Sequence, residues 1–221
     1  MSEKSNEVAF VCCAFGDKRY IEQQARLKHS ILEIYPDAPL FFWTNEMPPG
    51  ARSMSESLYG FKPHAVNYAL KKGYKKIMFF DPAIILMKPI DFYQDQVKEF
   101  GVCCARDDNK LSGFCGDRAL KYLGLEREEI KDWHLVGGSF YYFDFEYTLS
   151  EKIFYNWFST ELAGLFGSQK EQATDQLKGH RNDEAMMALA LYTSGSKPMS
   201  GDVRYNCENK EVEIIAKKHF K

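Results

Sequence analysis

Residues 74–92 limit the choice of fold more than any other part of the sequence. Residues 77–80 are a short, continuous apolar run, which is typical of a strand buried on both faces of an α/β sheet. Asp81 follows directly and Pro82 comes next, and because proline cannot donate to a sheet ladder, regular pairing should end there. Asp81 is therefore predicted at the carboxyl end of a buried strand, where open α/β sheets bind ligands. A turn or capping role for this aspartate is the alternative.

Strands and helices alternate through the first half of the chain. The patterns predict strands at 8–14, 40–44 and 100–105, and helices from Lys18 to about Glu33 and from Pro63 to just before Gly73. Such alternation is typical of a mostly parallel sheet covered by helices on both faces. The second half is more mixed, with helices predicted at 117–123, 147–166 and 185–192, an aromatic strand at 140–144, and short strands at 202–205 and 212–216.

Length and charge narrow the class of protein. The chain has 221 residues, which suffices for one α/β domain. Its net charge of −2 shows no excess of basic residues of the kind that indicates nucleic-acid binding. The N-terminus lacks a signal-peptide core and no apolar run is as long as a membrane span, so we expect a cytoplasmic protein or an excised domain. The ending at residues 217–221 is compatible with a domain of a longer, multidomain chain.

Six cysteines are present, and four of them form the adjacent pairs Cys12-Cys13 and Cys103-Cys104 within apolar runs. Neighbouring strand residues point to opposite faces, so neither pair is placed to bridge itself. No spacing typical of a metal site occurs among the cysteines and histidines. We therefore predict reduced cysteines that lie mostly in the core.

The junction between the first strand and the first helix is a candidate ligand site. A short loop leads from Ala14 through Phe15 and Gly16 to Asp17, which is a good N-cap for the helix that follows. Backbone N–H groups at such a junction are available to an anion or a base. An ordinary connection between a strand and a helix is the alternative reading of this loop.

Charged residues mark three further places. Lys62 stands just before the predicted helix at Pro63, and Arg106 follows the strand at 100–105, where its guanidinium is suited to bidentate contact with a diphosphate. Asp183 and Glu184 open the last helix, where a capping role explains one acid but not both. The alternative for Lys62 and Arg106 is a solvated surface position.

Trp133, Gly137 and Gly138 precede the aromatic strand. The glycines permit close backbone approach to a ligand, and the indole is a plausible stacking face for a sugar ring, although tryptophan is more often a packing residue. Residues 167–179 are polar and have the composition of a mobile loop over a site.

The segment around Asp81 resembles the metal and nucleotide-sugar motif of GT-A fold glycosyltransferases, in which a buried strand ends in Asp-x-Asp. Here the motif is Asp81-Pro82-Ala83, so the second aspartate is missing. The resemblance implies a GT-A-like, Rossmann-related α/β fold with a mixed, mostly parallel sheet and helices on both faces. It implies a single glycosyltransferase domain over residues 1–221, with about 8–110 binding the nucleotide-sugar and about 111–221 binding the acceptor.

The resemblance also implies roles for individual residues. Asp183 or Glu184 would be the base that deprotonates the acceptor hydroxyl in an inverting enzyme. A Mn²⁺ or Mg²⁺ cofactor would be held by Asp81, with Asp107, His219, or the diphosphate and water completing its ligands. Trp133, Gly137 and Gly138 would face the acceptor. The donor would be bound by Ala14, Phe15, Gly16, Lys62, Asp81, Pro82, Ala83 and Arg106.

The opening residues 9–16 and the Asp-Pro-Ala variant are also similar to the N-terminal glycosyltransferase domain of chlorovirus glycan-synthesis proteins. This closer resemblance implies a UDP-sugar donor carrying a hexose or a deoxyhexose such as rhamnose, and a viral surface glycan as the acceptor.

Two other functions are compatible with the sequence. One is a non-catalytic module that binds a nucleotide or sugar through a degenerate Asp-x-Asp motif. The other is a nucleotidyltransferase, although such enzymes carry a glycine-rich, basic loop after the first strand, whereas this loop holds one glycine and the acid Asp17.

Overall fold

The computed structural model of the chain describes residues 8–167, 178–199 and 215–217. Most of the predicted mobile loop at 167–179 therefore lies outside the described residues. So do Cys207, His219 and the predicted strand at 202–205.

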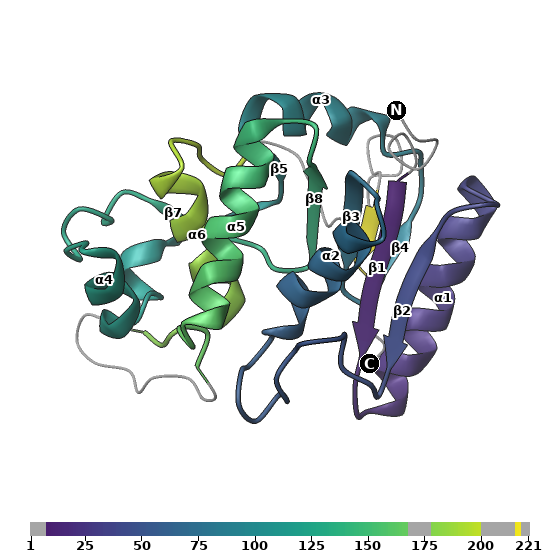
Figure 1. Ribbon diagram of the computed structural model, residues 1–221, viewed down its shortest axis with the longest axis horizontal. Helices are drawn as coiled ribbons and strands as arrows, with labels where there is room; N and C mark the ends of the chain where they lie inside the picture. The colour runs from purple at the N-terminus through teal and green to yellow at the C-terminus, as the bar shows by residue number, and fades with distance from the viewer. Residues whose placement is uncertain (1–7, 168–177, 200–214, 218–221) are drawn as a thin grey trace.

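A central sheet of five strands, in the order β2-β1-β3-β8-β5, organises the fold (Figure 1). β1 pairs in parallel with both β2 and β3, while β8 runs antiparallel to its two neighbours, β3 and β5. The sheet is therefore mixed and mostly parallel, as the sequence predicts. Its strands are β1 (Val8–Ala14), β2 (Leu40–Thr44), β3 (Lys76–Phe80), β5 (Val102–Cys103) and β8 (Phe140–Asp144).

Two small antiparallel pairs complete the strands of the described residues. β4 (Ile84–Leu86) pairs with β9 (Ile215–Lys217), and β6 (Arg106–Lys110) pairs with β7 (His134–Val136). β8 comes from the half of the chain assigned to the acceptor, yet it lies between β3 and β5. The two halves are thus interleaved in one sheet, and their division between donor and acceptor stays a prediction.

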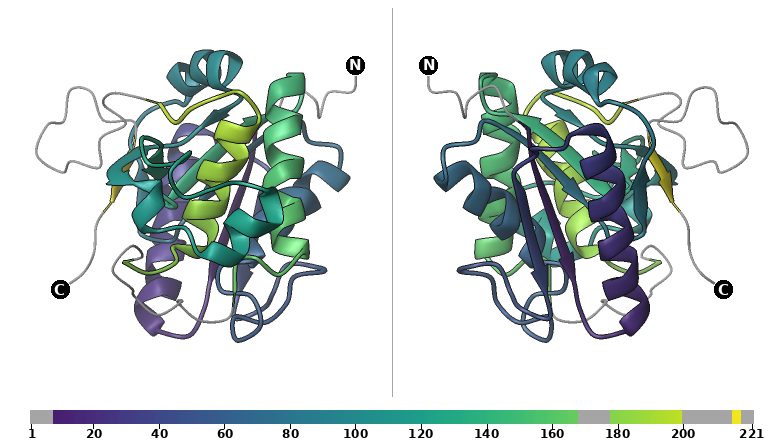
Figure 2. Two further views of the ribbon diagram at one scale, coloured as in Figure 1. Left: turned by 90° about the vertical axis from the view of Figure 1, so that its left-hand side faces the viewer. Right: turned by 90° about the vertical axis from the view of Figure 1, so that its right-hand side faces the viewer.

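Helices cover both faces of the sheet. They are α1 (Lys18–Ile34), α2 (Phe61–Lys71), α3 (Asp91–Phe100), α4 (Asp117–Leu123), α5 (Thr148–Leu162) and α6 (Asn182–Thr193), with a short 3₁₀ turn at Leu111–Gly113. Figure 2 shows α1 and α5 on opposite sides of the sheet.

Alternation along β1 builds the core on both faces. Val11 and Cys13 pack on the side of α2, α5 and α6, whereas Phe10 and Cys12 pack on the side of α1 and α3. Cys103 and Cys104 divide between the two faces in the same way. Among the described residues five cysteines are free and buried, as predicted, and burial raises the pKa of the Cys104 thiol to about 12.

Local signals at the chain turns explain several element ends. The Asp17 carboxylate accepts a hydrogen bond from the Arg19 backbone N–H at 2.8 Å and so caps α1, as predicted. Gly101 ends α3 with φ of +77°, a left-handed conformation that favours glycine. None of the helices in the described ranges has the length and apolar character that crossing a bilayer requires.

Several predicted boundaries were wrong. A helix, α3, occupies Asp91–Phe100, for which the sequence patterns predicted no helix, and the strand expected at 100–105 is reduced to β5. α2 begins at Phe61, two residues before Pro63. The helix expected at 147–166 ends at Leu162, whose side chain is 62% exposed, while the neighbouring Glu161 is buried.

Candidate active site

Asp81 lies at the carboxyl end of β3, as the sequence predicts. Its backbone N–H donates to the Ser139 carbonyl at 2.8 Å, which extends the pairing of β3 with β8 by one residue. Pro82 follows, and the chain turns away through a hydrogen bond from the Ile84 N–H to the Asp81 carbonyl. The carboxylate is 30% exposed and lines two hollows that meet at this edge of the sheet.

The larger hollow is a cleft of about 310 Å³ with mostly apolar walls. Five of the residues predicted to bind the donor line it, namely Ala14, Phe15, Asp81, Pro82 and Ala83. The sequence did not single out the other lining residues, Cys13, Tyr20, Met54, Tyr59 and Phe61. Aromatic side chains of this kind suit the flat face of a nucleobase or the apolar face of a sugar.

The smaller hollow is a polar pocket of about 150 Å³ that shares Asp81 and Tyr59 with the cleft. Lys62 lines it from the start of α2, and Asp183 and Glu184 line it from the first turn of α6. Tyr59 stands between the hollows with φ of +63°, a strained value for a residue with a side chain. Ser139, Arg181 and Asn182 complete the pocket.

Lys62 connects the two acidic sides of this pocket. Its Nζ donates to the Gly138 carbonyl at 2.8 Å and to Asp183 Oδ2 at 2.7 Å, and it lies 3.6 Å from Asp81 Oδ1. The side chain is buried, and the ammonium also lies 5.2 Å from the centre of the Tyr59 ring. The sequence-based alternative of a solvated surface lysine is therefore wrong.

Charges around Lys62 hold its proton in place. Burial alone would lower the pKa of the ammonium, but the carboxylates of Asp183 and Asp81 outweigh that effect and raise it above its ordinary value. Burial raises the pKa of Asp183, and the neighbouring ammonium opposes this rise. Asp183 also accepts a hydrogen bond from the Tyr141 hydroxyl at 3.3 Å, so its Oδ2 is shared between two buried donors.

Glu184 is held more loosely than Asp183. Its Oε1 accepts from the Gly138 N–H at 3.1 Å, its Oε2 lies 3.4 Å from Arg181 Nε, and its side chain is 23% exposed. Burial, followed by the charge of Asp183, raises the pKa of Glu184 to about 7. A carboxylate in this environment can both accept and release a proton near neutral pH.

Gly138 explains how these groups come so close together. A Cβ atom at this position would lie 2.9 Å from Asp183 Oδ2 and from Glu184 Cγ, and 3.1 Å from Lys62 Nζ. Glycine is therefore required at the start of β8 for the pocket to close around the ammonium. The groups that approach Gly138 closely are side chains of the pocket itself, and the predicted approach to a ligand stays a prediction.

Four other predicted residues line neither hollow. Arg106 begins β6 and pairs with Asp108 at 3.4 Å, and Trp133 stacks on Tyr192 with ring centres 4.6 Å apart. The N–H of Gly137 donates to Ala105, and that of Gly16 donates to Asn45 Oδ1 at 2.9 Å. Backbone N–H groups of this loop were expected to be available to an anion or a base, but the Gly16 N–H is already taken by the Asn45 side chain. Roles in binding for the four residues stay predictions.

The described residues do not make a metal site of their own. Mn²⁺ and Mg²⁺ prefer several oxygen ligands, but Ala83 replaces the second aspartate of the motif and no group of three or more candidate ligands forms within the described ranges. Asp107, one of the expected additional ligands, is engaged by the Asn109 backbone and side-chain N–H groups at 2.8 and 2.7 Å. His219 lies outside the described residues. The cofactor therefore stays an untested prediction, without support from the ligands that the structure places here.

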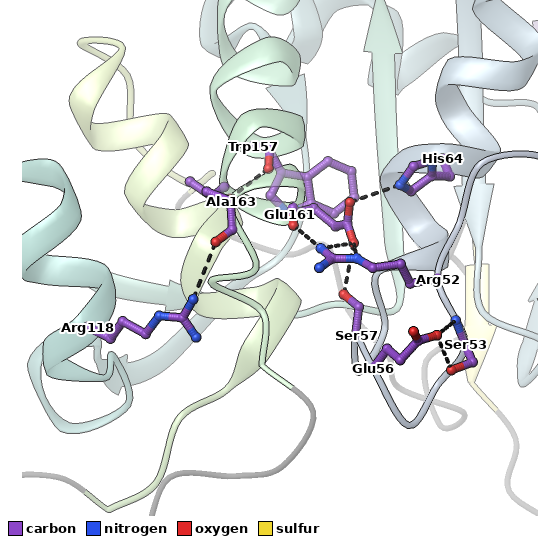
Figure 3. A network of polar contacts seen from close by, with 10 residues as sticks. Arg52, Ser53, Glu56, Ser57, His64, Arg118, Trp157, Glu161 and Ala163 are labelled. Atoms are coloured by element: carbon purple, nitrogen blue, oxygen red, sulfur yellow. Dashed lines mark hydrogen bonds and ion pairs between the residues drawn. The ribbon is translucent and has the colours of Figure 1, made fainter.

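A second network of buried charges supports the wall of the cleft (Figure 3). Glu161, near the end of α5, accepts hydrogen bonds from Ser57 at 2.9 Å and from Arg52 at 2.7 Å, and its other oxygen lies 2.9 Å from His64 Nε2. The Leu58 N–H also donates to the Gly167 carbonyl at 2.8 Å. These contacts fix the segment that carries Met54 and Tyr59, both of which line the cleft.

One feature of the sequence indicates part of this network. Ile153, Trp157 and Glu161 follow one another at helical spacing, so that a carboxylate continues a buried apolar stripe. A charged residue at such a position needs buried partners. Its partners Arg52, Ser57 and His64 are about 100 residues away in the sequence, where local patterns give no indication of them.

The fold of the chain is similar to that of solved structures. The chain is similar to the crystal structure of a glycosyltransferase involved in the glycosylation of the major capsid of PBCV-1, with a TM-score of 0.57 and 9% identity over 96% of this chain and 92% of that one. The fold is thus GT-A-like, and the resemblance stated from the sequence is confirmed as a likeness of fold.

A second similar structure is that of the bifunctional glycosyltransferase WbbM, with a TM-score of 0.50 and 13% identity. The match covers 88% of this chain but only 39% of the WbbM chain. No protein-family model matches the sequence, and no curated protein matches it.

Proposed function

We propose that the chain is a glycosyltransferase that moves a hexose or deoxyhexose from a UDP-sugar to a hydroxyl group of a glycan acceptor. The observation that carries the proposal is the junction of two hollows at the carboxyl edge of a GT-A-like sheet. One is an apolar, aromatic cleft and the other a charged pocket, and they share Asp81 and Tyr59. A nucleotide-sugar has the same division, with a flat base at one end and a diphosphate and sugar at the other.

The proposal assigns the nucleoside to the cleft beside Ala14 and Phe15, where an aromatic wall can cover the base. The diphosphate then lies near Asp81 and Lys62, and the sugar extends toward Glu184 in the pocket. In this arrangement residues from both halves of the chain contact the donor. The acceptor enters from the side of α6, and a viral surface glycan as acceptor stays a prediction.

Asp183 and Glu184 divide two tasks in this proposal. Asp183 is buried and holds Lys62, so it positions the ammonium. Glu184 is the general base, because it is partly exposed and has a pKa near neutrality. As the acceptor oxygen attacks the anomeric carbon, its proton passes to Glu184 and the bond from that carbon to the β-phosphate oxygen breaks. Direct displacement of this kind inverts the anomeric carbon.

Titration calorimetry with UDP and GDP, followed by a transfer assay with a panel of UDP-sugars and simple glycan acceptors, tests the proposal. We expect UDP to bind, and sugar transfer to depend on Glu184. The change Glu184→Gln should lower kcat/KM roughly 10²- to 10⁴-fold, the usual contribution of a general base. The exposed Glu151 on α5 gives the matched control Glu151→Gln, which should leave transfer unchanged.

Wild-type kcat/KM should rise with pH up to about 7 and then level off, as Glu184 loses its proton. The change Glu184→Gln should remove this dependence. UDP binding without any turnover would favour the non-catalytic module instead. Failure of a folded protein to bind either nucleotide would refute the donor site.

A further inference from the structure

The Lys62 ammonium occupies the place where a nucleotide-sugar enzyme needs positive charge. When the donor breaks, negative charge gathers on the leaving diphosphate, and a fixed cation stabilises it. In the described part of the chain, Asp81 is the one carboxylate of the motif, and the position of the second holds Ala83, whose apolar side chain lines the cleft. No group of three or more possible ligands in these ranges is placed to hold a divalent ion.

The geometry of Lys62 suits it to this task. Lys62 lines the pocket, and its Nζ lies 3.6 Å from Oδ1 of Asp81, a residue that lines both hollows. A lysine ammonium has three donor hydrogens, and within the described residues Nζ uses two, to Gly138 and Asp183. The third hydrogen is thus left for an incoming oxygen acceptor on the side of Asp81. A divalent ion bound to Asp81 Oδ1 would stand next to this ammonium and be repelled by it.

We propose that Lys62 supplies the positive charge at the diphosphate, so that donor binding and transfer do not require a divalent metal. The inference rests on the proposed function and deepens it. In the transfer step, the β-phosphate oxygen keeps the electron pair of the broken bond and accepts a hydrogen bond from Lys62 Nζ. The acceptor oxygen forms the new bond to the anomeric carbon, and its proton passes to Glu184. Asp81 and Asp183 are then positioning residues that hold the ammonium from two sides.

The first test uses the unmodified protein. UDP is titrated into the wild type in excess chelator and, separately, in Mn²⁺, and transfer is measured in the same two buffers. We expect the Kd for UDP to differ by less than about threefold between the two buffers, and we expect the same of kcat/KM. Such a difference is well below the tenfold step that corresponds to 1.4 kcal/mol. Binding or transfer that occurs only with Mn²⁺ overturns the inference but leaves the proposed glycosyltransferase in place.

Variants then identify the group that carries the charge. Lys62→Met keeps the length of the side chain and removes its charge, and it should weaken UDP binding at least about tenfold in both buffers, as expected for loss of a hydrogen bond from a charged group. Lys71→Met, at the exposed end of the same helix, is the matched control and should bind UDP as the wild type does. Asp81→Asn should change the Kd for UDP by the same factor in chelator and in Mn²⁺.

The results separate the two proposals. If Asp81→Asn abolishes binding that the wild type shows only with Mn²⁺, Asp81 is a metal ligand and the inference is wrong. If Lys62→Met binds UDP as tightly as the wild type in chelator, Lys62 is not the cation and the inference is wrong. The two titrations of the wild type decide the matter even if Lys62→Met fails to fold. Absence of nucleotide binding in both buffers refutes the proposed function itself.

Discussion

Removal of the Glu161 carboxylate should destabilise the protein strongly, although this residue lies outside the candidate active site. Glu161→Ala leaves the buried side chains of Ser57 and His64 without their acceptor. Each unsatisfied group costs about 1–3 kcal/mol, whereas Arg52 is 38% exposed and can turn toward water. We expect a loss of about 3–4 kcal/mol, within the range of about 3–5 kcal/mol known for breaking a buried ion pair.

Urea unfolding followed by tryptophan fluorescence measures this loss, because Trp157 lies one turn away on α5. For a chain of this length the loss corresponds to a fall in Tm of roughly 10 °C. The control Glu151→Ala removes an exposed acid from the same helix and should change stability by no more than about 0.5 kcal/mol. The reasoning is wrong if Glu161→Ala loses less than about 1 kcal/mol or matches Glu151→Ala.

The same network makes a prediction about pH. Burial alone would raise the pKa of Glu161, but the hydrogen bonds from His64, Arg52 and Ser57 outweigh it and hold the pKa below its ordinary value. The stabilisation is therefore fully present above the pKa of the unfolded chain and is lost as pH falls through the folded pKa. The stability difference between wild type and Glu161→Gln should narrow on acidification, and a difference that widens instead would contradict this assignment.

Two further predictions concern packing. Gly138→Ala places a Cβ against Asp183, Glu184 and Lys62, so it should lower kcat/KM and cost about 1–3 kcal/mol in unfolding experiments. Gly113→Ala should do neither, because a Cβ there would meet only the Lys178 side chain, at 3.8 Å, which is an ordinary contact. Equal activities for the two variants would refute the close packing around Lys62. The five described thiols are buried, and burial raises the pKa of Cys104 to about 12. A disulfide reagent such as Ellman's reagent should therefore modify at most one of the six cysteines of the native protein and all six in denaturant, and rapid reaction of two or more in the native state would contradict their burial.

Local sequence patterns predicted the framework of the fold. The apolar run before Asp81, the cap at Asp17 and the aromatic strand before Asp144 each carry their signal within a few residues. α3 was missed although Tyr93, Val97 and Phe100 follow one another at helical spacing and pack in the core, because the polar residues between them obscure this stripe. A local pattern also could not show that Lys62 is buried by contacts at the far end of the chain.

The candidate site was only partly predictable for the same reason. Asp81, Lys62, Asp183 and Glu184 were all singled out, but each as a separate feature of its own segment. Lys62 and Asp183 are 121 residues apart in the sequence, and their ion pair depends on how α2 and α6 pack against α5, which contacts both. Arg106 had an equally good local signal, yet it lies on β6 beside Asp108 and lines neither hollow.

The central place of β8 has a consequence for how the chain folds during synthesis. The parallel strands β1, β2 and β3 and helices α1 and α2 are complete by Phe80, but the outer edge of β3 has no partner until residues 140–144 leave the ribosome. For some sixty residues of elongation an apolar strand edge stays open, and such edges promote aggregation. Joining β8 to β3 also closes a long loop, which is slow compared with local pairing. The yield of folded protein should therefore depend on elongation rate and on chaperones that cover β3 until β8 arrives.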